Sequence, residues 1–487
     1  MLRKIRIALA SIFFGLITLM FLDFTGTLHL YLGWMAKVQL LPAILAMNFG
    51  VVAIILLLTF IFGRFYCSII CPLGVMQDVF SHLGGKVWKR RFHYTKNHKW
   101  LRISVLVIFV ILMVMGLNAI AVLIAPYSAY GRIATHLFQP VYIWLNNLCA
   151  FFAERVNSYA FYHVDVWLKS GIALAISIIT FVVIGLLSFR YGRVWCNNIC
   201  PVGTILGFIS KFSLFHIHMD VSKCVSCELC SSQCKASCIN PKEHTIDYSR
   251  CVGCMDCIEN CKRGGISYKF RYTKKNKEDK VVDSSNRKFI ATSAVLGTAM
   301  AVEAQEMKVD GGMAVIEDKK VPNRKIPLKP AGALSLKNFS NHCTSCQLCV
   351  SECPNQVLRP SKDITTLMQP EMSFELGYCR PECTRCSEVC PAGAITRIDS
   401  VEKSAIRIGH AVWVRDNCLM AAGEKCGLCE RNCPAGAILL VNDPETGFKI
   451  PSVNESRCIG CGKCENLCPA RPFSAIYIEG HEVHMKS

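Results

Sequence analysis

The cysteines of this chain constrain its fold more than any other feature, because 24 of the 30 form six blocks of four. Each block places three cysteines close together and a fourth slightly further on. Three thiolates can then wrap one face of an inorganic cluster while the fourth closes the site. Zinc sites with four thiolates favour two C-x2-C pairs separated by a longer spacer. The pattern therefore predicts six [4Fe-4S] clusters.

Two of the blocks share the spacing C-x2-C-x2-C-x3-C, which is typical of a two-cluster ferredoxin. In such modules the fourth cysteine usually serves the other cluster. We therefore expect Cys261 to complete the first set and Cys234 the second. The predicted ligands are Cys224, Cys227, Cys230, Cys234, Cys251, Cys254, Cys257 and Cys261.

Four further blocks lie near the end of the chain, and each closes with a Cys-Pro pair. The second and third have a longer first gap, as often happens in multi-cluster electron-transfer subunits. The spacing leaves their pairing open: either block one pairs with four and two with three, or neighbours pair. The predicted ligands are Cys343, Cys346, Cys349, Cys353, Cys379, Cys383, Cys386, Cys390, Cys418, Cys426, Cys429, Cys433, Cys458, Cys461, Cys464 and Cys468.

A membrane-embedded part is indicated by a hydrophobic fraction of 52% and a mean hydropathy of +0.34. Four apolar stretches are long enough, at 1.5 Å per residue, to cross a hydrocarbon core of about 30 Å. A purely soluble or disordered chain is thereby excluded, and membrane lipid is an expected partner. The net charge of +19 does not by itself imply that the chain binds nucleic acid, and we do not expect nucleic acid as a partner. The stretches are 5–24, 40–62, 101–125 and 168–189.

Basic residues in short loops predict the orientation, because positive loops stay in the cytoplasm. The loop 63–100 carries seven Lys and Arg residues, whereas 24–39 carries only Lys37. The amino terminus and the loop 63–100 are therefore expected inside and 126–167 outside. Arg190 and Arg193 then return the chain to the cytoplasm. We expect a multi-pass protein of the bacterial inner (cytoplasmic) membrane, with a cytoplasmic first ferredoxin domain.

A basic run at 269–280 precedes a mildly apolar stretch at 289–304. With Arg287, Lys288 and Phe289 at its start, this stretch resembles a twin-arginine export signal. It either crosses the membrane, which would place the last ferredoxin domain in the periplasm, or serves as an interdomain linker. The expected architecture is multi-domain: an α-helical membrane bundle of four spans, or five, plus α+β bacterial-type ferredoxin domains. The expected domains are 1–215 (membrane), 216–268 (two clusters), 269–340 (linker and lead-in) and 341–487 (four clusters).

Four of the remaining cysteines lie in a duplicated motif of the membrane part. The twelve residues 63–74 reappear at 192–203 with seven identities, including Gly-Arg at the start and Cys-Pro near the end. Each copy follows an even-numbered span, which indicates a parallel repeat. The thiols Cys67, Cys71, Cys196 and Cys200 form either a redox-active or metal-binding site or a set of packing residues. Cys149 and Cys238 are expected to be packing or spare thiols.

The duplicated motif followed by a two-cluster ferredoxin resembles the NapH-type membrane polyferredoxins of periplasmic nitrate reductase systems. The export-like stretch, the Pro-rich segment 327–333 and the last four blocks resemble the NapG-type ferredoxin. The chain therefore resembles a fusion of the two. The resemblance implies a quinol dehydrogenase-like component, which takes electrons from the quinone pool and passes them to a periplasmic reductase or cytochrome partner.

A quinol site needs proton acceptors near the bilayer surface, and polar residues at helix ends are the candidates. The same residues could instead be interfacial anchors. A rival function is a redox assembly factor that matures a respiratory metalloenzyme and uses the four thiols of the duplicated motif as its working site. A redox sensor is disfavoured, because six clusters are more than sensing needs. The outer candidates are Asp23, His29, Tyr127, Tyr130, His136 and Gln139, and the inner ones are Gln77, Asp78 and His82.

Overall fold

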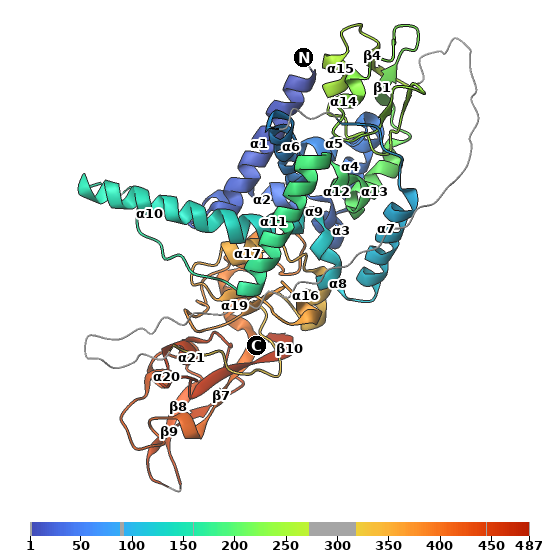
Figure 1. Ribbon diagram of the computed structural model, residues 1–487. Coiled ribbons are helices and arrows are strands. Elements are labelled where there is room, and N and C mark those ends of the chain that lie inside the picture. The colour runs from blue at the N-terminus through green and yellow to red at the C-terminus, as the bar shows by residue number, and fades with distance from the viewer. Residues whose placement is uncertain (1, 88–91, 159, 272–317, 445, 487) are drawn as a thin grey trace.

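The computed structural model describes residues 2–87, 92–158, 160–271, 318–444 and 446–486. Three parts follow one another along the chain (Figure 1): a helical unit (2–214), a first cysteine-rich unit (215–271) and a second cysteine-rich unit (318–486). The export-like stretch 289–304 lies outside the described residues.

The helical unit contains two helices, α1 and α11, that are long and apolar enough to cross a membrane. Each has 21 residues, with a mean hydropathy of 2.3 for α1 and 2.7 for α11. α4 and α13 are apolar but shorter. The helices of this unit are α1 (Leu2–Leu22), α2 (Leu28–Lys37), α3 (Leu40–Leu45), α4 (Phe49–Phe62), α5 (Phe65–Ile69), α6 (Pro72–Val87), α7 (Lys99–Val114), α8 (Asn118–Ala121), α9 (Pro126–Ile133), α10 (Gln139–Arg155), α11 (Gly171–Tyr191), α12 (Val194–Asn198) and α13 (Pro201–Ser210).

Two of the predicted membrane helices are interrupted. The stretch 40–62 was expected to be one helix, but Met47 adopts a left-handed backbone (φ 53°) and Asn48 caps α4 by accepting a hydrogen bond from the Val51 N–H. The stretch 101–125 breaks at Gly116, whose φ of 80° lies in the left-handed region that favours glycine. The prediction of a continuous helix over each stretch is therefore wrong, and neither piece reaches 18 residues.

The segment 126–167, expected as a loop, begins with the helices α9 and α10. A proline stands in the first turn of each helix, where its missing N–H costs no intrahelical bond. α10 projects sideways from the bundle in Figure 1. This end of the helical unit is therefore more ordered than its sequence suggested.

The first cysteine-rich unit is held together by an antiparallel pair of strands. β1 and β4 pair in the register that sets Ile217 opposite Tyr268, and they bring the two ends of the unit together. The short helices α14 and α15 contact each other between these strands. The elements are β1 (Phe215–Met219), α14 (Leu229–Ser232), β2 (Ile239–Asn240), β3 (Thr245–Ile246), α15 (Asp256–Asn260) and β4 (Ile266–Phe270).

The second cysteine-rich unit is built from two-stranded antiparallel sheets, β5 with β6, β7 with β10 and β8 with β9. Residues 318–340, expected as a lead-in, pack against this unit: Lys319 donates to the carbonyl oxygen of Glu465 at 2.7 Å. The elements are α16 (Leu336–His342), α17 (Leu348–Ser351), β5 (Leu358–Pro360), β6 (Pro370–Met372), α18 (Arg385–Val389), α19 (Ser400–Ala405), β7 (Ile406–Trp413), α20 (Leu428–Arg431), β8 (Ile438–Asn442), β9 (Lys449–Val453), α21 (Lys463–Leu467) and β10 (Ile476–Lys486).

The helical unit separates the two cysteine-rich units, which contact its opposite ends (Figure 1). At the start of α1, Arg3 forms an ion pair with Asp256 of the first unit at 2.8 Å. Just beyond the end of α1, His29 hydrogen-bonds to Glu388 of the second unit at 3.1 Å. A 21-residue helix is about 30 Å long. The two units are therefore separated by roughly the thickness of a bilayer core.

The duplicated motif folds in the same way in both copies. α4, α5 and α6 in the first copy correspond to α11, α12 and α13 in the second, and α5 and α12 occupy equivalent positions in the repeat. The copies pack reciprocally: α11 lies against α6, and α13 lies against α4. The two repeats are therefore related by a local twofold arrangement.

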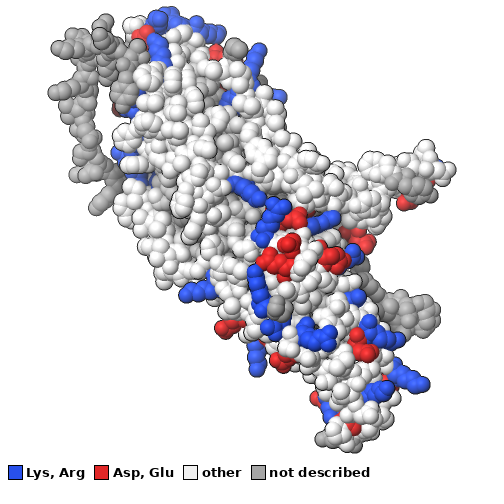
Figure 2. Space-filling view, turned by 180° about the vertical axis from the view of Figure 1, so that it is seen from behind, with Lys and Arg blue, Asp and Glu red and all other residues white. Residues whose placement is uncertain are grey.

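The surface of the helical unit carries large exposed apolar side chains, including Leu57, Ile108 and Leu186, which are 56–65% exposed. Figure 2 shows a broad area without charged side chains, bounded by Lys and Arg at one end and by mixed charges over the second cysteine-rich unit. Apolar surface of this extent marks an interaction with lipid or with another protein.

Candidate iron-sulfur centres

The C-x2-C-x2-C loops share an unusual backbone that bends three thiols around one centre. The second residue after the first cysteine and the residue after the second cysteine both have positive φ. Ser226 and Glu228 adopt this conformation in the first block, and Gly460 and Gly462 do so in the last. Ser345 and Gln347 repeat the pattern. Left-handed conformations of non-glycine residues are costly and persist where the surrounding structure needs them.

In the first cysteine-rich unit, the fourth cysteines are exchanged between the two blocks. Cys261 lines one cavity together with the first three thiols of the other block. Burial raises the pKa of the Cys254 thiol, and the charges of Asp256 and Cys234 raise it further, so Cys234 lies near the second block. The two sets are Cys224, Cys227, Cys230 with Cys261, and Cys251, Cys254, Cys257 with Cys234.

In the second cysteine-rich unit, neighbouring blocks exchange their fourth cysteines. Three of the four sets each line a cavity of their own. In the fourth set, burial and then the charges of nearby thiols, Cys433 among them, raise the pKa of Cys464. The sets are Cys343, Cys346, Cys349 with Cys390; Cys379, Cys383, Cys386 with Cys353; Cys418, Cys426, Cys429 with Cys468; and Cys458, Cys461, Cys464 with Cys433.

These cavities fit a polynuclear group better than a single ion. Within the described residues, no group of three His, Cys, Asp or Glu side chains lies close enough to hold one metal ion. Backbone N–H groups also point at the sulfurs: Ile395 donates to Cys390 at 3.4 Å, and Ala475 donates to Cys468 at 3.3 Å. Hydrogen bonds to ligand sulfurs tune the reduction potential of iron-sulfur clusters.

Lys403, on α19, lies against the set of Cys379, Cys383, Cys386 and Cys353. Its ammonium donates to Cys379 Sγ at 3.2 Å and to the carbonyl oxygen of Arg380 at 2.6 Å. The side chain is buried, so its charge is poorly screened. Lys403 therefore stabilises the more negative, reduced state of any cluster held there.

Replacing Lys403 by Met is expected to make the midpoint potential of that cluster more negative by about 60 mV. A charge-assisted hydrogen bond contributes about 1.5 kcal/mol, and 1.4 kcal/mol corresponds to about 59 mV for one electron. Redox titration followed by EPR measures the shift. Lys362→Met, at an exposed position of the same unit, is the matched control. Equal potentials in the Lys403→Met variant and the wild type would contradict the assignment.

The four cysteines of the duplicated motif lie together inside the helical unit, each 3–4% exposed. Burial raises the pKa of Cys200 well above its ordinary value, and the charges of Cys196, Cys71 and Cys67 raise it further. The site adjoins the first cysteine-rich unit, because Asn197 donates to the carbonyl oxygen of Ala236 at 3.3 Å. The duplicated motifs are thus brought together by the fold.

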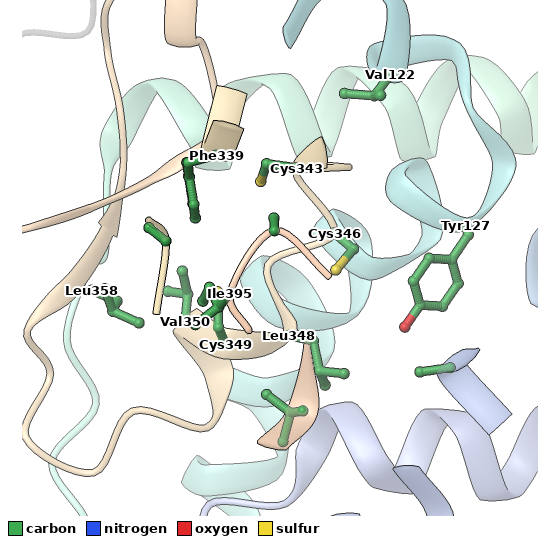
Figure 3. Packing of buried hydrophobic residues seen from close by; sticks show 14 of the residues in the cluster. Val122, Tyr127, Phe339, Cys343, Cys346, Leu348, Cys349, Val350, Leu358 and Ile395 are labelled. Atoms are coloured by element: carbon green, nitrogen blue, oxygen red, sulfur yellow. The ribbon is translucent and has the colours of Figure 1, made fainter. Parts of the chain in front are cut away.

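Two tyrosines lie between this thiol site and the second cysteine-rich unit. Tyr66 donates to Gln39 Oε1 at 2.7 Å, and the charges of Cys71 and Cys67 add to burial in raising its pKa. Tyr127 is 1% exposed, and the charges of Cys346, Cys390 and Tyr66 add to burial in raising its pKa. Figure 3 shows Tyr127 beside Cys346. The sequence gives no spacing signal for Tyr66.

The outer quinol candidates have different surroundings. Gln139 lines a cavity of about 1050 Å³, open to solvent, between α10, the segment 162–169 and Cys353. His29 lies between Glu388 at 3.1 Å and Glu352 at 3.7 Å. Asp23 accepts hydrogen bonds from the N–H groups of Thr25 and Leu28, Tyr130 hydrogen-bonds to Thr18, and Tyr127 and His136 are buried.

The inner candidates do not form one site. Asp78 lies among three cations: Arg193 at 2.7 Å, Arg6 at 2.9 Å and Lys235 at 3.2 Å. Gln77 is fully buried, and His82 is exposed. Asp78 therefore has a structural role, joining the two repeats and the first cysteine-rich unit.

The two single cysteines also differ in their surroundings. Cys149 is exposed on α10. Cys238 is buried, and its sulfur lies 3.6 Å from Cys234 Sγ. Cys238 thus packs directly against a predicted cluster ligand.

Comparison with known families agrees with these centres. A profile described as a 4Fe-4S binding domain matches residues 44–91 and 172–220. One 4Fe-4S dicluster profile matches 342–394 and 424–471, and a second matches 247–357. The match at 342–394 covers the first two blocks of the second cysteine-rich unit, and the match at 424–471 covers the last two blocks except Cys418. No solved structure gives a significant match.

Curated relatives are ferredoxin-type proteins. The chain is 30% identical to the ferredoxin-type protein NapG of Escherichia coli, over 36% of this chain and 74% of the relative. It is 29% identical to the methylamine utilization ferredoxin-type protein MauM of Methylobacillus flagellatus, over 40% of this chain and 84% of the relative. The ferredoxin-type protein NapF of Escherichia coli is 26% identical over 32% of this chain and 87% of its own length. The chain therefore belongs to the family of NapG-type ferredoxins, iron-sulfur electron-transfer proteins with 4Fe-4S domains.

Proposed function

We propose that this chain joins a NapH-type membrane part to a NapG-type ferredoxin, oxidises a membrane quinol and delivers the electrons to a periplasmic reductase of the nitrate-reductase type. The observation that carries the proposal is the position of the two cysteine-rich units at opposite ends of an apolar helical unit. Quinol oxidation releases two protons and two electrons, and the electrons travel singly along the clusters. A membrane-spanning arrangement of this kind suits transfer between the quinone pool and a soluble acceptor.

Six [4Fe-4S] clusters occupy the six cysteine sets, with the fourth cysteine of each block completing the neighbouring set. When bound, they supply one-electron redox chemistry. The residues of this chain do the rest: the thiolates hold each cluster, backbone N–H groups donate to the sulfurs, and Lys403 sets the local charge. No general acid or base is needed for these steps.

The quinol binds in the cavity beside Gln139, at the junction of the helical unit and the second cysteine-rich unit. Phe24, Tyr162 and Trp167 supply apolar and aromatic walls, and Cys353 lies at one side. A quinol held there would lie next to the cluster that Cys353 serves. Lys169 also lines the cavity and donates to Gln139 Oε1 at 2.5 Å. Burial lowers its pKa to about 7, against a smaller opposite effect of Cys353.

The rate of quinol oxidation is expected to rise with pH through about 7, because Lys169 accepts a proton only in its neutral form. Lys169→Met should remove this rise and slow the reaction at pH 8 about a hundredfold, the lower end of general-base contributions. Stopped-flow absorbance of cluster reduction between pH 6 and 8 measures both effects. Lys37→Met, at an exposed position of α2, should behave as wild type. A wild-type pH slope in Lys169→Met would refute the role.

The helical unit crosses the bacterial inner membrane four times, with the interrupted segments 40–62 and 101–125 completing the bundle around α1 and α11. The first cysteine-rich unit faces the cytoplasm and the second faces the periplasm. An epitope tag placed after residue 487 is expected to be accessible in spheroplasts. Accessibility only in inverted vesicles would reverse this orientation.

The proposed function is tested by mixing the purified protein with a reduced quinol under anaerobic conditions and following the clusters by EPR. Rapid reduction that a quinone-site inhibitor blocks is the expected result. If dithionite reduces every cluster but quinol reduces none, quinol is not the donor. Loss of maturation of a partner metalloenzyme in a Cys67→Ser variant that still oxidises quinol would favour the assembly factor.

A further inference from the structure

The thiols of the duplicated motif have the arrangement of a ligand set rather than of packing residues. All four are at most 4% exposed, and they come in pairs from two segments 129 residues apart. Burial and then Cys196 and Cys67 raise the pKa of the Cys71 thiol, so thiols of both repeats lie within electrostatic range of one another. No three of these side chains, nor any others among the residues described, are close enough for a single metal ion.

The arginines of the two motifs are also related by the local twofold arrangement of the repeats. Arg193 of the second repeat donates to the Cys67 carbonyl oxygen at 2.5 Å, and Arg64 of the first donates to the Cys196 carbonyl oxygen at 3.2 Å. A Cβ on Gly203 would lie 2.8 Å from Arg64 Nη2 and would collide with the Cys196 carbonyl oxygen. Each repeat therefore uses its arginine to hold the cysteine segment of the other.

Arg64 supplies a buried positive charge between the four thiols and the segment just before Cys251, where it donates to the carbonyl oxygens of Ser249 and Arg250. Its guanidinium is 0% exposed and donates to Asn197 Oδ1 at 2.6 Å, with one nitrogen 3.8 Å from Cys67 Sγ. Among the described residues, no carboxylate forms an ion pair with it. A buried charge without an ionic partner is destabilising. An anionic group among the four thiols would offset that cost.

We propose that Cys67, Cys71, Cys196 and Cys200 together hold a seventh iron-sulfur cluster, with two thiolates from each repeat. Four thiolates are the ligand set of both dinuclear and tetranuclear clusters, and their negative charge matches Arg64. The 4Fe-4S binding profile supports this assignment, because these four are the only cysteines in its matched ranges, 44–91 and 172–220.

The position of the site indicates that the cluster transfers electrons between the two cysteine-rich units. Asn197, next to Cys196, donates a hydrogen bond to the carbonyl oxygen of Ala236, which lies two residues after Cys234. On the other side, Tyr66 and Tyr127 lead to Cys346 of the second cysteine-rich unit. The cluster takes one electron from a reduced neighbour, which is thereby oxidised, and passes it to the next. It divides the roughly 30 Å between the units into shorter steps.

The test compares iron and acid-labile sulfide in full-length protein purified anaerobically in detergent. Cys67→Ala combined with Cys196→Ala, which removes one ligand from each repeat, is expected to lose about four iron atoms per chain, or about two for a dinuclear cluster. The EPR signals of the other clusters should stay unchanged. Cys149→Ala, at an exposed cysteine, is the control and should keep all its iron. Wild-type iron content in the double variant would overturn the proposal.

A second variant covers the case in which the double variant does not fold. Arg64→Gln keeps all four thiols and removes the positive charge. It should retain wild-type iron while the midpoint potentials of two centres become more negative, the proposed one and the one that Cys251 serves, because Arg64 lies beside both and each reduced state loses a compensating cation. A shift confined to the centre that Cys251 serves, or no shift at all, would overturn the proposal. Since these measurements do not use quinol, failure of the quinol reaction with the iron difference intact would reject only the proposed donor.

Discussion

Cys343→Ala combined with Cys390→Ala is expected to alter one cluster, whereas Cys343→Ala combined with Cys353→Ala should alter two. The reason is the exchange of fourth cysteines: Cys343 and Cys390 line one cavity, while Cys353 lines the cavity of Cys379. EPR of the reduced proteins should therefore lose the signal of one cluster in the first variant and of two in the second.

Iron analysis gives an independent measure of the same effect. The first variant should lose up to about four iron atoms, and the second up to about eight. Cys353→Ala combined with Cys379→Ala is the matched control, because both residues serve the other cavity and only its cluster should change. If instead Cys343 with Cys353 affected one cluster and Cys343 with Cys390 affected two, each block would serve its own cluster.

Asp78→Asn is expected to destabilise the protein by about 3–5 kcal/mol, the range for removing one partner from a buried ion pair. The variant leaves Arg6, Arg193 and Lys235 close together without their shared carboxylate. Thermal unfolding in detergent, followed by tryptophan fluorescence, should show a midpoint several degrees lower. Asp165→Asn, whose side chain is 91% exposed, should unfold as wild type. If Asp78→Asn lowered the free energy of unfolding by less than 1 kcal/mol, other groups would have to balance the charges of the three cations.

The pH dependence of this effect has a definite sign. Burial alone would raise the pKa of Asp78, but Arg193 and Lys235 outweigh it and hold the pKa well below its ordinary value. The stabilisation is therefore fully present above about pH 4 and is lost only as the pH falls towards the pKa of the folded state. Between pH 5 and 8 the difference between wild type and Asp78→Asn should stay constant.

The cysteine spacing predicted the thiol sets of the first cysteine-rich unit but could not decide those of the second. A C-x2-C-x2-C segment fixes which thiols share a loop, since the left-handed residues within it bend the chain locally. The partner of that loop depends on how the intervening chain folds. Here β5 and β6 return the chain between blocks one and two, so Cys390 reaches Cys343.

The helical unit was less predictable because hydropathy measures apolar character and not backbone shape. Met47 is apolar and fits the predicted span, yet its φ of 53° ends α3. Gly116 is a helix-breaking residue, but the apolar residues on both sides of it favoured the prediction of one continuous span over 101–125. At α11 the sequence and the structure agree more closely. The Ser170 side chain caps this helix and sets its start at Gly171, close to the predicted start at 168.

Charge counting also misjudged particular residues. Arg64 and Arg193 were counted among the positive loop residues, but both are 0% exposed. Their partners, such as Asn197 and Asp78, are more than 100 residues away in the chain. Lys403 and Tyr66 were not predicted either, because their partners Cys379 and Gln39 lie 24 and 27 residues away, outside any local motif.

The reciprocal packing of the two repeats has an evolutionary consequence. When residue i of one copy contacts residue j of the other and the reverse also holds, the interface is of the kind that a twofold homodimer presents. A shorter ancestor with one Gly-Arg-x-x-Cys-x3-Cys-Pro motif would have needed two copies of itself to bring four thiols together. Duplication and fusion of such an ancestor would make that pairing intramolecular and leave each half free to diverge; Asn197 in the second copy corresponds to Ser68 in the first.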